Sequence, residues 1–80
     1  MNEVAALVRR VRATRLPDPA RRRALRVDAG LSLRDVGEAL HTDPVSVMRW
    51  ERGSTPRPSM AASYAKLLQA LERECHRAAS

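Results

Sequence analysis

The basic residues are the strongest candidates for a binding function in this sequence. The chain carries 15 basic and 9 acidic residues, a formal net charge of +6, and Lys66 is its single lysine. The arginine guanidinium forms forked hydrogen bonds to phosphate oxygens and guanine edges. The charge therefore predicts attraction to polyanions, with nucleic acid first and an anionic membrane surface second. The alternative is that the basic residues form an ordinary solvated surface, and net charge alone does not distinguish this from polyanion binding.

One pair of neighbours, Cys75 and His76, has the residue types of a nucleophile and a base. Adjacent residues of a helix point about 100° apart, and no third polar partner lies near in sequence. We therefore predict no catalytic residues and no enzyme activity. The single cysteine cannot form an internal disulfide, and no zinc-ligand spacing is present. Consequently, no metal and no other cofactor is expected.

Prolines and glycines divide the sequence into five predicted helices. No segment shows the sustained alternation of apolar and polar residues that is typical of a strand. The apolar runs fall far short of the roughly 20 residues that span a membrane, and no signal peptide is recognised. The predicted helices cover about residues 2–15, 19–29, 33–41, 44–52 and 59–77.

The boundaries of the middle helices follow from residue types that satisfy free backbone groups. Asp18, Ser32 and Asp43 are predicted N-caps, because their side-chain oxygens can accept hydrogen bonds from the first turn. Gly30 and Gly53 are predicted C-terminal stops, since glycine adopts the left-handed conformation without a steric penalty. Three successive short helices are therefore expected in the middle of the chain.

Apolar residues at helical spacing predict one buried face in four of the five helices. Trp50, three residues after Val47, is predicted to be a core residue and not a base-stacking one. The stripe of the first helix is expected to pack on the domain, with docking to a partner subunit as the alternative. The predicted faces comprise Val4, Leu7, Val8 and Val11; Leu33, Val36 and Leu40; Val47 and Trp50; and Tyr64, Leu67, Leu68, Leu71 and Cys75.

The third and fourth helices form the most informative unit of the sequence. Only a few residues join them, which forces a large crossing angle and lets the second helix project from the surface. An α-helix fits the major groove of B-DNA, where each base pair presents a distinct hydrogen-bonding pattern. The fourth helix offers Val45, Ser46, Met48, Arg49 and Arg52 on faces that the core does not need.

Residues 21–71 resemble the Cro and phage-repressor (XRE-type) helix-turn-helix domain. The resemblance is carried by Gly30-Leu31-Ser32 and by Trp50-Glu51-Arg52-Gly53 at the correct spacing, and the whole match includes 26–40, 43–53, Pro56 and the Tyr64 to Leu71 helix. It implies an all-α, compact five-helix domain with a helix-turn-helix, similar to that of lambda repressor. On this basis residues 1–16 are an extra N-terminal amphipathic helix, and residues 17–80 are the DNA-binding domain with a long C-terminal helix.

The resemblance also implies roles for individual residues. Arg26 and Glu51 take the positions of a structural ion pair, and Gly37 takes the small-residue site where the two helices approach closely. The implied base-reading residues are Pro44, Val45, Ser46 and Arg49. The implied phosphate-binding residues are Ser32, Leu33 through its backbone N–H, Arg34, Arg52 and Arg57.

Two departures from the family pattern affect the reading surface. His41 stands where the family usually has a glycine in the turn, so we expect a mildly strained or slightly different turn. Pro44 and Val45 stand where the family often has amides or serines, so fewer direct hydrogen bonds to bases are expected.

The function that follows is a sequence-specific, double-stranded-DNA-binding transcriptional regulator, a Cro-like repressor in a bacterial cytoplasm or nucleoid. The alternatives are the antitoxin of a toxin–antitoxin pair and a helix-turn-helix protein-interaction module, in which the N- or C-terminal helix could dock a protein partner. A basic amphipathic membrane binder fits only the first helix. The operator sequence, monomer or homodimer on DNA, and phage or host origin stay open.

Overall fold

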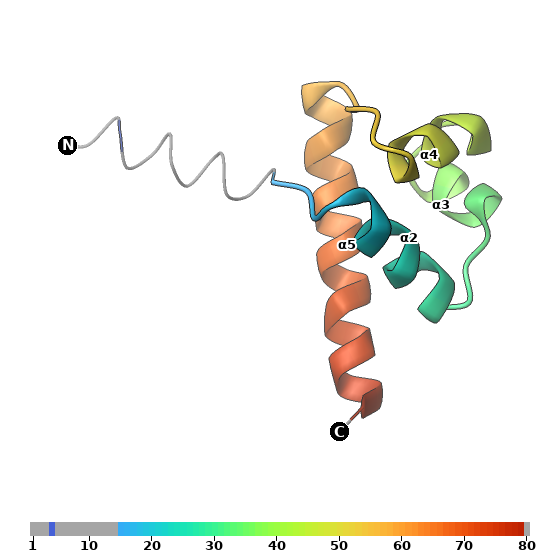
Figure 1. Cartoon of the computed structure of the whole chain (residues 1–80), viewed down its shortest axis with the longest axis vertical. Coiled ribbons are helices and arrows are strands. Elements are labelled where there is room, and N and C mark those ends of the chain that lie inside the picture. The colour runs from blue at the N-terminus through green and yellow to red at the C-terminus, as the bar shows by residue number, and fades with distance from the viewer. Residues whose placement is uncertain (1–3, 5–14, 80) are drawn as a thin grey trace.

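The computed structural model describes residue 4 and residues 15–79, with side chains described as far as residue 77. This part of the chain is all-helical, as predicted, and contains α2 (Pro19–Asp28), α3 (Leu33–Ala39), α4 (Pro44–Glu51) and α5 (Pro58–Ala79) (Figure 1). The described helices therefore number four, where the sequence predicted five. The difference arises because the helix predicted over residues 2–15 lies almost wholly outside the described residues.

Side chains cap the first turns of the three short helices. The carboxylates of Asp18 and Asp43 each accept a hydrogen bond from the backbone N–H three residues later, at 2.9 and 2.8 Å. Ser32 and Asp35 cap α3 reciprocally, because each side chain accepts from the other residue's backbone N–H, at 2.9 and 2.8 Å. These bonds satisfy donors that have no partner within the helix, and they confirm the predicted N-caps.

The same three helices end with a residue in the left-handed conformation. These residues are Gly30, His41 and Gly53, with φ angles of 74°, 57° and 113°. After each one, the next backbone N–H donates to the carbonyl five residues back, at 3.1, 2.8 and 3.0 Å. These hydrogen bonds satisfy carbonyl groups in the last turn of each helix. His41 is the only residue other than glycine with a positive φ in the described chain. Of the mildly strained and the slightly different turn expected there, the left-handed His41 corresponds to the first.

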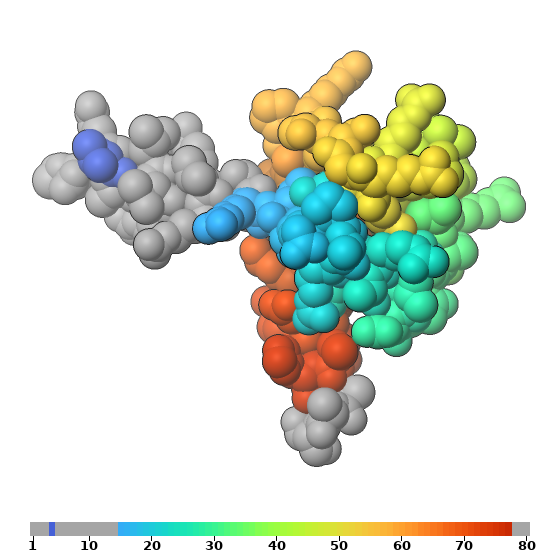
Figure 2. Space-filling model, viewed as in Figure 1, coloured from blue at the N-terminus to red at the C-terminus, as the bar shows by residue number. Residues whose placement is uncertain are grey.

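α5 is the longest helix, and its Tyr64 contacts Trp50 of α4. α2 packs along it, while α3 and α4 pack against each other on the far side of α2 (Figures 1 and 2). Arg22 links α2 to the end of α4, because its guanidinium donates to the carbonyl of Pro17 at 2.7 Å and to that of Trp50 at 2.8 Å.

Within the described residues, no helix has both the length and the apolar character needed to cross a bilayer.

A small apolar core lies where the four helices meet. Trp50 is 7% exposed and its ring centroid lies 5.0 Å from that of Tyr64, so Trp50 is a core residue as predicted. Cys75 is exposed, and its predicted place on the buried face is wrong, because the last turns of α5 extend beyond the packed core. The buried apolar residues are Leu25, Val36, Leu40, Val47, Trp50, Tyr64, Ala65 and Leu68.

Gly37 lies where α3 approaches the turn that leads into α4. A Cβ atom at this position would lie 2.8 Å from the carbonyl oxygen of Thr42 and 3.3 Å from the carbonyl carbon of Asp43. Both neighbours are backbone atoms, which cannot move aside as the end of a flexible side chain can. The absence of a side chain at Gly37 therefore allows the turn to close.

We predict that Gly37→Ala destabilises the protein by about 1–3 kcal/mol, because the added methyl group overpacks this contact. Helix propensity alone would act in the opposite direction, stabilising α3 by about 1 kcal/mol. Urea unfolding of the two proteins distinguishes these effects by sign. A more stable Gly37→Ala variant would show that the close approach is not sterically limiting.

Tyr64 is buried beside charged groups. Its side chain is 1% exposed, and its hydroxyl has no hydrogen-bond partner among the described residues. Burial, followed by the negative charge of Glu51, raises the pKa of Tyr64 to about 12. The native fold therefore favours the neutral phenol over the phenolate.

We predict that the protein loses stability as the pH rises from about 10, the ordinary tyrosine pKa, through about 12. Below pH 10 the contribution of the neutral phenol is fully present, because both folded and unfolded chains keep the proton. Tyr64 is the single tyrosine, so the ultraviolet absorbance of tyrosinate follows it alone. Tyr64→Phe should lack this alkaline loss, and titration of native Tyr64 near pH 10 would contradict the assignment.

Candidate nucleic-acid interface

The α3–α4 pair presents one face of α4 to solvent. Val47 and Trp50 are buried, with Val47 fully inaccessible, and they define the inward side of the helix. At about 100° per residue, Val45 and Arg52 fall on the opposite side, flanked by Met48 and Arg49. This outward face of α4 is the surface that a helix-turn-helix can present to another molecule.

The residues expected to read bases differ in their surroundings. Pro44, Val45 and Arg49 are exposed on α4. Ser46 is half-buried, and its hydroxyl donates to Oδ2 of Asp43 at 3.2 Å, while its backbone N–H donates to Oδ1 at 2.8 Å. The backbone bond from Ser46 is the main cause of a lowered pKa for Asp43. The hydroxyl of Ser46 thus belongs to the cap of α4 in this structure.

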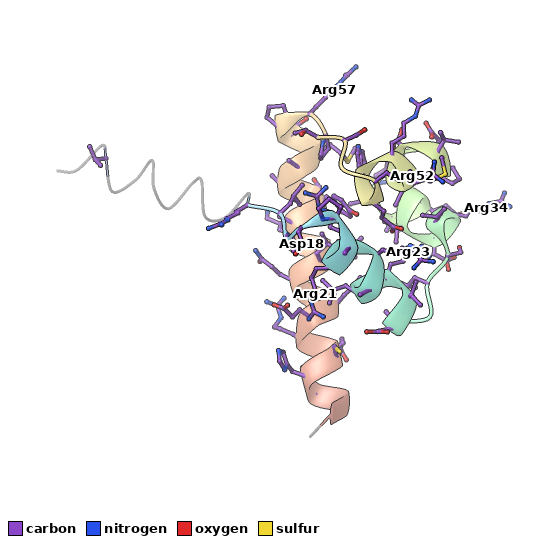
Figure 3. All side chains as sticks on the ribbon, viewed as in Figure 1. Asp18, Arg21, Arg23, Arg34, Arg52 and Arg57 are labelled. Atoms are coloured by element: carbon purple, nitrogen blue, oxygen red, sulfur yellow. The ribbon has the colours of Figure 1, made fainter. Side chains whose placement is uncertain are left out.

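The residues expected to bind phosphate come from three different elements. Arg34 begins α3, Arg52 follows α4, and Arg57 lies just before α5 (Figure 3). All three are exposed, and Arg34 and Arg57 extend away from the body of the protein. Ser32 is also exposed but its backbone N–H donates to Asp35, and Leu33 is half-buried against the core.

The cations of this surface have few acidic neighbours. Arg34 lies 3.6 Å from Glu38 in an exposed pair on the surface of α3, which is a weak interaction in water. Arg49, Arg52 and Arg57 form no ion pair with any residue in the described part of the chain. Their charges are consequently available to an anionic partner.

The three successive arginines of α2, Arg21, Arg22 and Arg23, differ in their surroundings. Arg21 pairs with Glu72 of α5 at 3.1 Å, and Arg22 is bonded to two backbone carbonyls. Arg23 is exposed and has no ion pair within residues 15–77. Only Arg23 of this run therefore keeps a free guanidinium.

The two residues expected to form an ion pair, Arg26 and Glu51, lie in contact. Nε and Nη2 of Arg26 donate to the two carboxylate oxygens of Glu51 at 2.6 and 3.0 Å, and Nη1 donates to the carbonyl of Leu31 at 2.9 Å. The side chains are 13% and 6% exposed. Hydrogen bonding to Glu51 raises the pKa of Arg26. This forked geometry fixes the end of α4 against α2.

The described residues offer no group suited to metal binding. No three side chains of histidine, cysteine, aspartate or glutamate gather within this region where they could hold one ion. On the outward face of α4, the exposed guanidinium groups of Arg49 and Arg52 can supply hydrogen-bond donation and charge attraction.

We predict that Glu51→Ala lowers the free energy of unfolding by about 3 kcal/mol, because it leaves the guanidinium of Arg26 buried without its counter-charge. The double variant Arg26→Met with Glu51→Leu should recover part of this loss. Glu72→Ala is the matched control, since it removes an exposed pair and should cost less than about 1 kcal/mol. Equal losses for Glu51→Ala and Glu72→Ala in urea unfolding would refute a special role for the buried pair.

Comparison with known proteins gives one finding. Neither a curated protein nor a solved structure is significantly similar to this chain. The sequence does match the family described as "Helix-turn-helix domain" over residues 3–78. That family lies within the Cro and phage-repressor group, which confirms the resemblance seen in the sequence. With nearly its whole length matched, the chain belongs to the helix-turn-helix domain family.

Proposed function

We propose that this protein is a sequence-specific, double-stranded-DNA-binding transcriptional regulator that represses by occupying an operator. The observation that carries the proposal is the outward face of α4, where Arg49 and Arg52 lie opposite the buried Val47 and Trp50 without acidic partners in the described chain. A projecting helix with free guanidinium groups suits the major groove. No effector-binding module or enzymatic activity is part of this proposal.

The proposed contacts divide into base reading and backbone positioning. Arg49, exposed in the middle of α4, would form a forked pair of hydrogen bonds to a guanine edge. Pro44, Val45 and Ser46 would border the bases beside it. The proposed phosphate contacts come from Ser32, the backbone N–H of Leu33, Arg34, Arg52 and Arg57, which lie at the start of α3, just after α4 and just before α5.

A second candidate function is an antitoxin, which would bind a protein through the same domain that represses. The observation that favours it is a groove between α2 and the distal half of α5, with an apolar floor of Leu25, Leu31 and Leu71 and with Asp28, Ala29, Glu74 and Cys75 completing its lining. Such a groove can accept an apolar segment of a partner. DNA binding is common to both candidates, and only the antitoxin requires a toxin.

The first experiment is selection from a random pool of duplex DNA at physiological salt, followed by sequencing of the retained molecules. Salt is important because a protein with this net charge binds any DNA at low ionic strength. An enriched motif supports the regulator. A palindromic motif indicates a homodimer on DNA, and a single half-site indicates a monomer. The absence of any enrichment would overturn sequence-specific binding.

We predict different effects for Arg49, which lies in α4, and for Arg52, which follows it. Arg49→Ala should abolish discrimination at one base pair, costing about 1–3 kcal/mol on the selected site, with an almost unchanged melting curve. Arg52→Ala should weaken binding to all sequences alike and reduce the salt slope by about one unit. Titrations of both variants on selected and scrambled DNA at several salt concentrations test this. An Arg52→Ala variant with altered sequence preference would contradict the assignment.

A further inference from the structure

The first half of the outward face of α4 is apolar. Val45 is 49% exposed and is one of three large hydrophobic residues exposed in the described chain, the others being Val4 and Val27. Exposed Pro44 precedes it, and half-buried Met48 lies one turn further along the same side. The end of the helix expected to enter a groove first thus presents hydrocarbon to solvent.

This half of α4 also lacks a free side-chain donor. Pro44 and Val45 carry no polar side-chain atom, and the hydroxyl proton of Ser46 is already donated to Asp43. The carboxylate of Asp43 accepts from the backbone N–H and hydroxyl of Ser46. The first free donor along the outward face is therefore the guanidinium of Arg49.

The major-groove edges of the four base pairs contain one apolar group, the C5-methyl group of thymine. We propose that Val45, bordered by Pro44 and Met48, recognises a thymine C5-methyl group, so that part of the operator is read by apolar contact. This inference rests on the proposed function, because it names the chemical group that the same surface reads. Val45 would then distinguish thymine from the other bases without forming a hydrogen bond.

The surrounding charge favours a base edge over an apolar protein partner. Arg49 and Arg52 lie about one and two turns beyond Val45 along the same face, and neither is paired with an acidic residue in the described chain. An apolar partner covering Val45 would remove these guanidinium groups from water without an acceptor, which is costly. A DNA site instead supplies guanine and phosphate acceptors for these guanidinium groups while the methyl group covers Val45.

The helix geometry limits where the thymine lies. Val45 and Arg49 are four residues apart, which corresponds to about 6 Å along a helix. Successive base pairs are about 3.4 Å apart along DNA. The thymine should consequently lie within about two base pairs of the guanine that Arg49 reads.

The experiment uses the site selected by the whole protein. Each thymine within two base pairs of a guanine is replaced by deoxyuridine, which lacks the methyl group but keeps the same hydrogen-bonding edge. We expect the Kd to rise about fourfold at one such position, the effect of removing one buried methyl group. 5-Bromodeoxyuridine, which restores the bulk at C5, should restore most of the affinity.

Two valine variants show whether Val45 is responsible. In Val45→Ala, replacement of that thymine by deoxyuridine should change the Kd less than twofold. Val27→Ala is the matched control, because Val27 is also 49% exposed but lies on α2, and it should keep the full fourfold effect. Titrations of wild type and both variants on the three DNAs give all the necessary Kd values.

Different negative results would overturn the methyl-reading inference and the proposed function. If a motif is selected but deoxyuridine is tolerated at every position, or no thymine lies near a guanine, the methyl-reading inference is overturned and the proposed regulator stands. A deoxyuridine effect that persists in Val45→Ala also overturns the inference. If no motif is selected, both the inference and the proposed function are overturned, and the apolar face of α4 becomes a candidate protein-binding surface.

Discussion

The forked pair between Arg26 and Glu51 holds α4 in place. The guanidinium of Arg26 joins the end of α2 to the end of α4, and it also donates a hydrogen bond to the carbonyl of Leu31 in the link to α3. Taking two charges out of water is expensive, so such a pair contributes little net stability compared with a well-packed apolar contact. The pair instead fixes the orientation of α4, because both oxygens of Glu51 are engaged only when α4 has one rotation and one position relative to α2. The outward face of α4 depends on that rotation.

A second constraint sets the distance between α3 and α4. The connection is so short that its backbone passes directly over Gly37, and His41 adopts a left-handed conformation to let the chain turn. A left-handed residue other than glycine costs about 1–2 kcal/mol, and the hydrogen bond from Thr42 to the carbonyl of Gly37 offsets part of that cost. The turn, the cap at Asp43 and the core residue Val47 then act together. They place α4 with one side buried and the other in solvent.

The arginines serve two separate purposes. Arg22 and Arg26 lie among the helices and donate to carbonyl or carboxylate groups, so they are structural. Arg49, Arg52 and Arg57 are exposed on the side of α4 and the following loop, without ion pairs in the described chain. A high net charge is therefore not distributed evenly. The part of it that can attract DNA lies on the second half of the helix proposed to read it and in the following loop, while Val45 makes the first turn of that helix apolar.

Much of this architecture could be predicted because it depends on local interactions. The caps at Asp18, Ser32 and Asp43 join groups three residues apart, and the left-handed closures at Gly30, His41 and Gly53 join groups within five. Helix boundaries, helix class and the inward position of Trp50 follow from such spacing. The tertiary structure alone decided which member of Arg21-Arg22-Arg23 is free, because the partners Trp50 and Glu72 are 28 and 51 residues distant in sequence. It also decided that Cys75 is exposed, since periodicity identifies a face of α5 but not how far along that face other helices reach.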